Sequence, residues 1–211
     1  MFDQDKFKKV YARVRDIFRP DTDDPRFQYV RANWIFPNHI DLVIEFGRQL
    51  ANKYSANEEV VVLGALLHDV GLVYKRESAD TVGHEDRSAE YTEMILSEYG
   101  YPTDVIEGVK LCIYATEPST QLTTLEQKVL RTADGLAHIL SVHYYAKAKF
   151  SPDWDSALKF ITSKIEKDWG KLSFEDERNK VEPIYLYIKM VIEQHWKGEP
   201  VDLASLPWVK K

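Results

Sequence analysis

The sequence has little cysteine and no long apolar segment. Its one cysteine, Cys112, has no partner for an internal disulfide, and its place in the apolar run 109–113 favours an inert core thiol over a nucleophile. No stretch is apolar over the roughly 20 residues that a membrane-spanning helix needs. The first six residues carry acids where a secretory signal carries bases, so we expect a cytoplasmic, reduced protein.

Basic residues are also in the minority. Lys and Arg number 28 against 34 Asp and Glu, which gives a formal net charge of -6. Binding to a nucleic-acid backbone or to an anionic membrane usually requires a basic footprint. The composition therefore favours a small molecule as the partner, and we expect no nucleic acid and no membrane. A locally basic pocket is still compatible with this total charge.

The chain has no internal repeat, low-complexity tract or heptad array, and its apolar residues recur at helical spacing between short breaks. The run 60–67 is apolar on all sides. We interpret it as a central helix rather than a strand, because no other segment shows the alternation of a partner strand. The length of 211 residues fits one all-α domain.

Helix boundaries follow from local signals. Asn38 and Thr103 are expected caps, and Thr124 with Gln127 forms a capping-box pattern. Pro183 is expected to start or kink the last helix. The expected helices cover about residues 3–18, 38–50, 58–71, 85–99, 103–118, 125–150, 154–169 and 175–196, and residues 200–211 form a tail that docks through Leu203, Leu206 and Trp208.

The pair His68 and Asp69 closes the most apolar helix of the chain. Burying a carboxylate without a partner costs several kcal/mol, so something must compensate Asp69. A metal ion does so more completely than a hydrogen bond, because it neutralises the carboxylate and uses the imidazole at the same time. Near a helix end followed by Gly71, the two side chains can converge on one ion. His39 and Asp134 are candidates for the other ligands, since both lie within otherwise apolar faces.

The sequence contains four blocks in this order: Asn38–Ile40, Gly64–Gly71, His84–Ala89 and Leu125–Asp134. Together they resemble the HD superfamily of metal-dependent phosphohydrolases. The resemblance covers about residues 30–145 and implies an all-α HD-domain helical bundle with one divalent metal ion at its centre. We expect a single domain over residues 1–211, in which additional C-terminal helices form an extension over about residues 151–200.

Two departures from the family pattern narrow the choice of subfamily and the number of metal ions that we expect. Several subfamilies, including guanosine-tetraphosphate hydrolases and deoxynucleoside-monophosphate phosphatases, place a Glu three residues after the motif Asp, where this chain has Leu72. Subfamilies with two metals usually add a second His where this chain has residues 114–116, Tyr-Ala-Thr. A single ion is therefore expected.

A divalent ion held by two imidazoles and two carboxylates leaves two of six octahedral positions for water and a phosphate oxygen. Such ligands accept manganese, iron, cobalt, nickel, zinc or magnesium, so the metal's identity stays open. The resemblance implies that Asp69 is both a ligand and the base that accepts a proton from the attacking water. Charge on the phosphoryl oxygens then requires cations nearby.

Candidate cations and polar groups lie near the ligands in the sequence. His84 is the first choice for a catalytic cation, with Arg87 one turn further along. Lys75 is a candidate substrate contact from the preceding loop. Arg131 and His138 are substrate-binding candidates because they share the helix face of Asp134, and His138 has a second interpretation as a group that supports the ligands.

Each candidate also has a purely structural interpretation. Taken alone, His39 can be interpreted as a capping or core histidine. Asp134 can be interpreted as a partner for Arg131, and His84 as an N-terminal cap. We interpret His143 and His195 as surface or packing residues. The aromatic series of the last helices is interpreted as packing surface rather than a base-stacking platform, and it also offers a surface for a homodimer.

The sequence thus favours an enzyme that hydrolyses a phosphomonoester or phosphoanhydride of a small molecule, with nucleotides as the leading class by analogy to the family. The alternative is a non-catalytic ligand-sensing or scaffold domain with a structural metal, for which Leu72 is the best support. An oxygenase on the same scaffold needs redox-active iron and more ligands. The pocket walls are expected from loops 27–37 and 75–83 and the last three helices.

Overall fold

The computed structural model describes residues 2–18, 30–74 and 81–209, and the regular secondary structure of this part of the chain is entirely helical, without strands. The predicted all-α class is confirmed. The helices are α1 Gln4–Ile17, α2 Ala32–Ile35, a π-helix Phe36–Ile40, α3 Asp41–Tyr54, α4 Glu58–Leu67, a 3-10 turn Val70–Leu72, α5 His84–Glu98, α6 Thr103–Tyr114, α7 Leu125–Ile139, α8 His143–Lys149, α9 Trp154–Lys171, α10 Glu175–Lys197 and a 3-10 turn Leu203–Ser205.

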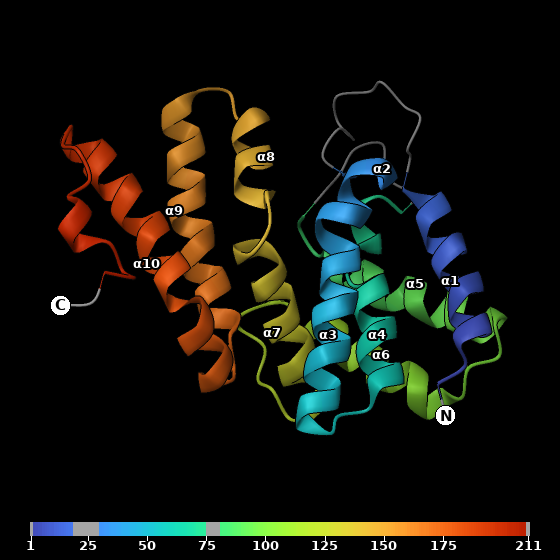
Figure 1. The fold of residues 1–211 in the computed structure, drawn as a ribbon. Coiled ribbons are helices and arrows are strands. Elements are labelled where there is room, and N and C mark those ends of the chain that lie inside the picture. The colour runs from blue at the N-terminus through green and yellow to red at the C-terminus, as the bar shows by residue number, and fades with distance from the viewer. Residues whose placement is uncertain (1, 19–29, 75–80, 210–211) are drawn as a thin grey trace.

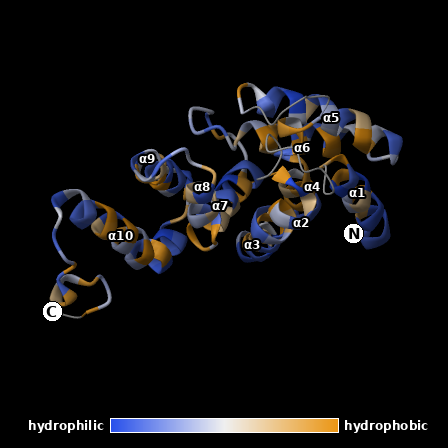
Figure 2. Ribbon diagram, turned by 90° about the horizontal axis from the view of Figure 1, so that it is seen from above, coloured by the Kyte–Doolittle hydropathy of each residue, from blue (hydrophilic) through white to orange (hydrophobic). Residues whose placement is uncertain are grey.

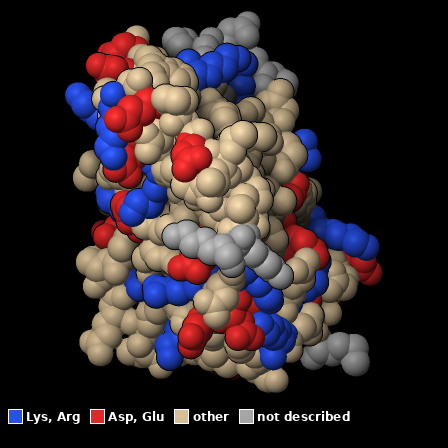
Figure 3. Space-filling view, turned by 60° about the vertical axis from the view of Figure 1, so that its left-hand side comes forward, with Lys and Arg blue, Asp and Glu red and all other residues tan. Residues whose placement is uncertain are grey.

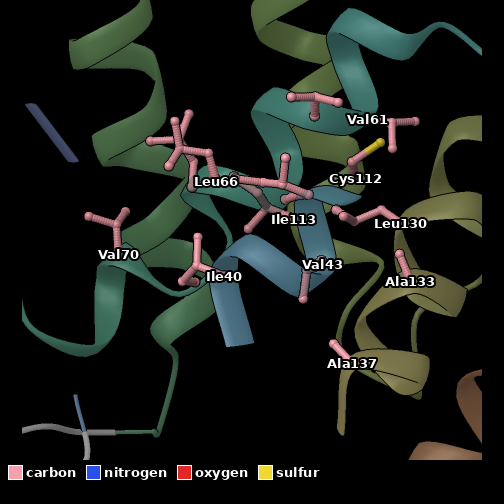
Figure 4. Close-up of a cluster of buried hydrophobic side chains, with 14 of the residues drawn as sticks. Ile40, Val43, Val61, Leu66, Val70, Cys112, Ile113, Leu130, Ala133 and Ala137 are labelled. Carbon is pink, nitrogen blue, oxygen red and sulfur yellow. The ribbon is translucent and has the colours of Figure 1, made fainter. Parts of the chain in front are cut away.

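The core is centred on α4, which packs against α3, α6 and α7 (Figure 1). Every residue from Val60 to Leu67 is buried, which explains why this segment is apolar on all sides. Figure 4 shows side chains of α4, α6 and α7 in one cluster, with Leu66, Cys112 and Leu130 among them. Burial raises the pKa of the Cys112 thiol, so the expected inert core cysteine is confirmed.

Several helix starts match their sequence signals. The Thr124 side chain accepts from the Gln127 amide, and Gln127 Oε1 accepts from the Thr124 amide, which is the predicted capping box. Two predicted caps are wrong. The helix expected at Asn38 begins earlier, at Ala32, and Asn38 Nδ2 instead donates to the Trp34 carbonyl at 2.7 Å. At Thr103 the cap residue is Pro102, whose fixed φ leads the chain into α6 without a side-chain bond.

The segment predicted as one helix over residues 125–150 is two helices. Helix α7 ends at Ile139, and α8 begins at His143, whose amide donates to the Ser141 hydroxyl at 3.1 Å. This local bond offered the backbone an alternative to continuing the helix. Helix α10, by contrast, begins at Glu175 and continues through Pro183.

Helices α8 to α10 form a layer on the outside of α7, on the side away from α1 (Figure 1). Helix α9 lies very close to α7 at Gly135, where a Cβ would be 2.8 Å from the Asp168 carbonyl oxygen. Helix α10 packs on α9 through the stacked rings of Trp169 and Tyr185, 4.3 Å apart. These two rings therefore pack helices together, in line with the packing interpretation of the aromatic series.

Helix α10 carries exposed apolar side chains, among them Leu186, Val191 and Trp196. Figure 2 shows orange, hydrophobic positions along the ribbon of this helix. The tail contacts this helix through Trp208, whose ring centroid is 5.2 Å from that of Tyr187, whereas Leu203 is 75% exposed and does not dock. In Figure 3, basic and acidic side chains are interspersed over the face on this side of the molecule. Among the described helices, none combines the length and apolar character needed to cross a membrane.

Candidate functional site

Three of the predicted ligands meet at the centre of the bundle. His39 comes from the π-helix before α3, His68 follows the last residue of α4, and Asp134 lies in the middle of α7. The Nε2 atoms of the two histidines are 3.1 Å apart, and Asp134 Oδ1 lies 3.5 Å from His39 Nε2 and 3.9 Å from His68 Nε2. All three side chains are buried. Their ligand atoms therefore point at one small volume.

Asp69 borders the same volume. Its Oδ2 lies 3.4 Å from His39 Nε2 and 3.6 Å from His68 Nε2. The Asp69 backbone has φ -102° and ψ 1°, a conformation between helix and strand that ends α4 and starts the 3-10 turn. Because of this bend, neighbours in sequence that would diverge on a regular helix converge here, as the sequence predicted for His68 and Asp69.

Hydrogen bonds behind the ligands fix the bend. His68 Nδ1 donates to the Ala65 carbonyl at 2.8 Å, so in the neutral ring Nε2 carries the lone pair. The buried Ser88 hydroxyl donates to the His68 carbonyl at 2.6 Å and accepts from the Gly71 amide at 2.9 Å. Gly71 is required, because a Cβ there would lie 2.2 Å from the His84 carbonyl oxygen. Helix α5 thus holds the end of α4 in place.

The electrostatics suit a metal. Burial lowers the pKa of His68, so its imidazole is neutral at pH 7. Burial opposes the charged form of Asp134, but Lys171 and the nearby histidines outweigh it and hold the pKa of Asp134 well below its ordinary value. Burial also opposes the charged form of Asp69, but the surrounding histidines outweigh it and hold the pKa of Asp69 well below its ordinary value. Metal ligation needs neutral imidazoles and ionised carboxylates, so this donor set fits a divalent cation.

Asp134 uses its two oxygens for different partners. Oδ2 accepts from Lys171 Nζ at 2.5 Å, while Oδ1 faces the two histidine Nε2 atoms. The Lys171 side chain is 10% exposed and comes from α9, 37 residues further along the chain. Sequence reasoning missed this partner. The sequence feature that could have indicated it is the set of lysines at 164, 167 and 171, which helical spacing places on one face.

The four side chains lie at the base of a pocket of about 690 Å³. Trp34 and Ile35 line one part of it, and residues 81–85 another, as expected from the sequence. Of the last three expected helices, the segment 125–150, which is α7 and α8 in the structure, and α9 contribute, whereas α10 does not. Residues 116–119 form a wall that was not expected.

The model of the HD domain family matches residues 38–139, which hold all four candidate ligands. Residues 38–139 form an HD domain. The resemblance drawn from four sequence blocks is therefore confirmed, and the matched region runs from the π-helix to the last residue of α7. No curated protein is significantly similar to the sequence.

Solved structures share the fold over nearly the whole chain. A predicted HD superfamily hydrolase from an uncultured Thermotogales bacterium is 23% identical, with 90% of this chain and 91% of that chain covered and a TM-score of 0.57. Bacillus subtilis YpgQ in complex with ADP is 18% identical, with 93% and 96% covered and a TM-score of 0.62. An HD-superfamily hydrolase of Bacillus thuringiensis is 20% identical, with 92% and 97% covered and a TM-score of 0.61.

His84 lies at the edge of the HD-domain site, with Nε2 3.6 Å from Asp69 Oδ1. Its Nδ1 donates to the Thr81 carbonyl at 2.9 Å, and Glu85 Oε2 is 3.1 Å from the same nitrogen. Burial lowers the pKa of His84, but the carboxylates of Asp69 and Glu85 outweigh burial and raise it to about 10. The ring is thus positively charged at pH 7 and lines the pocket.

The two arginines predicted to contact substrate lie elsewhere. Arg87 donates to the carbonyls of Gly71 at 2.8 Å and Val82 at 2.6 Å. Arg131 donates to the carbonyls of Ala115, Glu117 and Thr120 at 2.5, 2.7 and 2.7 Å. Neither lines the pocket. Both guanidinium groups instead donate to loop carbonyls. These bonds hold the segments 81–85 and 116–119, which form two walls of the pocket. Lys75 lies outside the described residues.

His138 packs directly against the candidate ligand His39. Its ring stacks on His39 with a centroid distance of 4.5 Å and an interplanar angle of 13°. Its Nδ1 lies 3.2 Å from Asp168 Oδ1 and 3.1 Å from Lys164 Nζ. Burial lowers the pKa of His138 to about 4, so the ring is neutral. His138 also lines the pocket, so its predicted contact with a substrate remains a proposal.

His143 is not at the surface. It is 8% exposed, lines the pocket, and its ring centroid is 4.2 Å from that of His138. Burial, with His138 and Lys164 adding to it, holds the pKa of His143 well below its ordinary value, so this ring is neutral. Sequence reasoning missed it because the break between α7 and α8, which turns His143 inward, was not recognised.

Proposed function

We propose that the protein is a metal-dependent phosphohydrolase that cleaves a phosphomonoester or phosphoanhydride of a small molecule. The observation that carries this proposal is the convergence of two buried imidazoles and two carboxylates at the base of a pocket with lysines along one wall. The HD domain and the structural relatives named as hydrolases support hydrolysis. The ADP complex of YpgQ supports nucleotides as the substrate class.

His39, His68, Asp69 and Asp134 would hold one divalent ion, which can be manganese, iron, cobalt, nickel, zinc or magnesium. When bound, the ion supplies Lewis acidity and lowers the pKa of water to near neutrality. The chain's own groups do the rest. Asp69 is the one carboxylate of the set that is partly exposed to the pocket, at 15% of its side chain, so it accepts the proton of the attacking water.

His84 stabilises the negative charge that develops on the phosphoryl oxygens, because it is protonated at pH 7 and faces the pocket. Arg87 acts indirectly. Its bonds to Gly71 and Val82 hold the segment that carries His84, so it is a positioning residue rather than a catalytic one. Lys164 and Lys171 add positive potential to the same wall.

The rival function is a ligand-sensing or scaffold domain with a structural metal. The observation that favours it is Leu72, which lines the pocket and is buried at the position where several catalytic subfamilies have Glu. The two functions differ in what His84 does. In a sensor, replacing His84 leaves metal content and folding unchanged and there is no turnover to lose.

A direct test is release of phosphate or pyrophosphate by the purified protein with manganese, cobalt, nickel or magnesium and a panel of nucleotides and sugar phosphates. We expect turnover of at least one compound, and a loss of about 100-fold in His84→Gln with metal content retained. His195→Gln is the matched control, because it makes the same change at a histidine that is exposed on α10 and does not line this pocket. Absence of turnover from every compound, with metal shown to be bound, would contradict the proposal.

A further inference from the structure

The pocket wall formed by α8 and α9 holds polar groups that the proposed mechanism does not use. His143 is 8% exposed, and both of its ring nitrogens lack a hydrogen-bond partner within the described residues. A buried donor or acceptor without a partner costs about 1–3 kcal/mol. This imidazole is therefore arranged for a group that the described part of the chain does not supply.

His143 lies beside the ligand cluster and is not part of the group of converging ligand atoms. Three histidine rings form a row, in which His138 stacks on His39 at 4.5 Å and His143 lies against His138 at 4.2 Å. The centroids of His39 and His143 are 6.0 Å apart. A group bound to His143 thus lies in the same pocket as the candidate ion, but further along it.

The wall beside His143 contains one lysine whose charge is not balanced by a carboxylate partner among the described residues. Lys164 Nζ pairs with Asp168 Oδ1 at 2.5 Å, and Asp168 Oδ2 accepts from the Tyr144 hydroxyl at 2.8 Å. Both oxygens of this carboxylate therefore already have partners inside the wall. Lys167 lies almost one turn after Lys164 on α9 and lines the same pocket. Among the residues that the structure describes, it has no ion-pair or hydrogen-bond partner, which leaves its ammonium group for a ligand.

We propose that His143 and Lys167 bind a second anionic group of the substrate, beyond the phosphoryl group at the candidate ion. The neutral imidazole of His143 donates one N–H to an anionic oxygen, and the Lys167 ammonium supplies the opposite charge. This inference rests on the proposed function and deepens it. A phosphoanhydride has a second phosphate for this subsite and a phosphomonoester does not, so the protein selects phosphoanhydrides.

Two probes separate the subsite from turnover. Methylenebisphosphonate has two phosphoryl groups joined by carbon, and methylphosphonate has one, so neither contains a P–O–P bond to hydrolyse. Their affinities for the full-length protein are measured by titration calorimetry at one constant magnesium concentration. We expect the bisphosphonate to bind more tightly, and the ratio of the two affinities to fall about tenfold in His143→Phe and in Lys167→Ala.

The variants are chosen to keep the fold. His143→Phe keeps an aromatic ring against His138 and removes both hydrogen-bonding nitrogens. Lys167 is exposed, so Lys167→Ala leaves the buried packing in place. Lys159→Ala is the matched control, since Lys159 is exposed on the same helix and does not line this pocket. We expect it to leave the affinity ratio unchanged.

An affinity ratio that stays at the wild-type value in both variants overturns the subsite, as does a wild-type protein that binds the two probes equally. Neither result affects the hydrolase proposal if phosphate release is observed. Conversely, a ratio that falls in both variants while no compound is hydrolysed supports the subsite and contradicts the proposed hydrolysis.

Discussion

At the scale of single residues, Ser88 shows how the site depends on a side chain outside the ligand set. Its hydroxyl is fully buried and makes two hydrogen bonds, one to the residue before Asp69 and one to Gly71. These bonds hold the backbone bend that lets His68 and Asp69 converge. Groups behind metal ligands typically affect metal affinity because they orient the ligands.

Ser88→Ala is therefore expected to lower the free energy of unfolding by about 1–3 kcal/mol, since the Gly71 amide and the His68 carbonyl lose their partner. We also expect divalent metal affinity to fall about 10- to 100-fold. Ser97→Ala, at an exposed position of the same helix, is the control and should change stability by less than about 0.5 kcal/mol. Urea unfolding and metal titration measure both effects; equal behaviour of the two variants would contradict this account.

The sequence predicted residues of the site where a local pattern constrained them. His39, His68 and Asp134 stand out because each is a polar group in an apolar face. Lys171 and His143 have no such local signal, since their partners come from other helices. Arg87 and Arg131 were placed in the pocket because charge is visible in a sequence, whereas the loop carbonyls that bind them are not.

At the scale of elements, the contact between α7 and α9 fixes where the lysine wall lies. Gly135 allows this close approach. In Gly135→Ala, the new Cβ would lie 2.8 Å from the Asp168 carbonyl oxygen, so we expect destabilisation by about 1–3 kcal/mol from overpacking. Gly170→Ala is the control, because no atom lies within 4 Å of its Cβ position, and it should stabilise α9 by about 0.5–1 kcal/mol. Thermal or urea unfolding distinguishes the two, and equal effects would contradict the packing described.

The contact between α3 and α10 depends on Glu177, a carboxylate that is 4% exposed. Glu177 accepts from Lys53 at 2.9 Å, Lys180 at 3.2 Å and the Tyr54 hydroxyl. Burial raises the pKa of Glu177, but these donors outweigh burial and hold it below its ordinary value of 4.5. Its contribution to stability is therefore complete above pH 4.5 and is lost as the pH falls through the lower, folded-state pKa.

In Glu177→Gln we expect a lower free energy of unfolding at pH 7 and a difference from the wild type that shrinks as the pH falls toward 3. Urea unfolding at several pH values measures this difference. Glu175→Gln, an exposed position two residues earlier in α10, is the control and should give a small, flat difference. A difference for Glu177→Gln that grows at acid pH would contradict the sign of the pKa shift.

At the scale of the whole molecule, periodicity and capping signals were enough to predict an all-α bundle, and the central helix at 58–67 was found from its apolar run. The packing of α9 on α7 was not predictable, because it depends on Gly135 and Asp168, which are distant in sequence. The ends of helices were missed where one local bond decided them, as at Ser141. The single domain, the homodimer and the cytoplasmic location stay predictions.

The central claim is that His39, His68, Asp69 and Asp134 hold one divalent cation. Elemental analysis of the folded, gel-filtered protein after incubation with manganese, cobalt, nickel or zinc tests it most directly. We expect about one ion per chain in the wild type and loss of that ion in His39→Ala and Asp134→Asn while the helical content is retained. A folded wild type that retains no ion, or variants that retain the full amount, would contradict it.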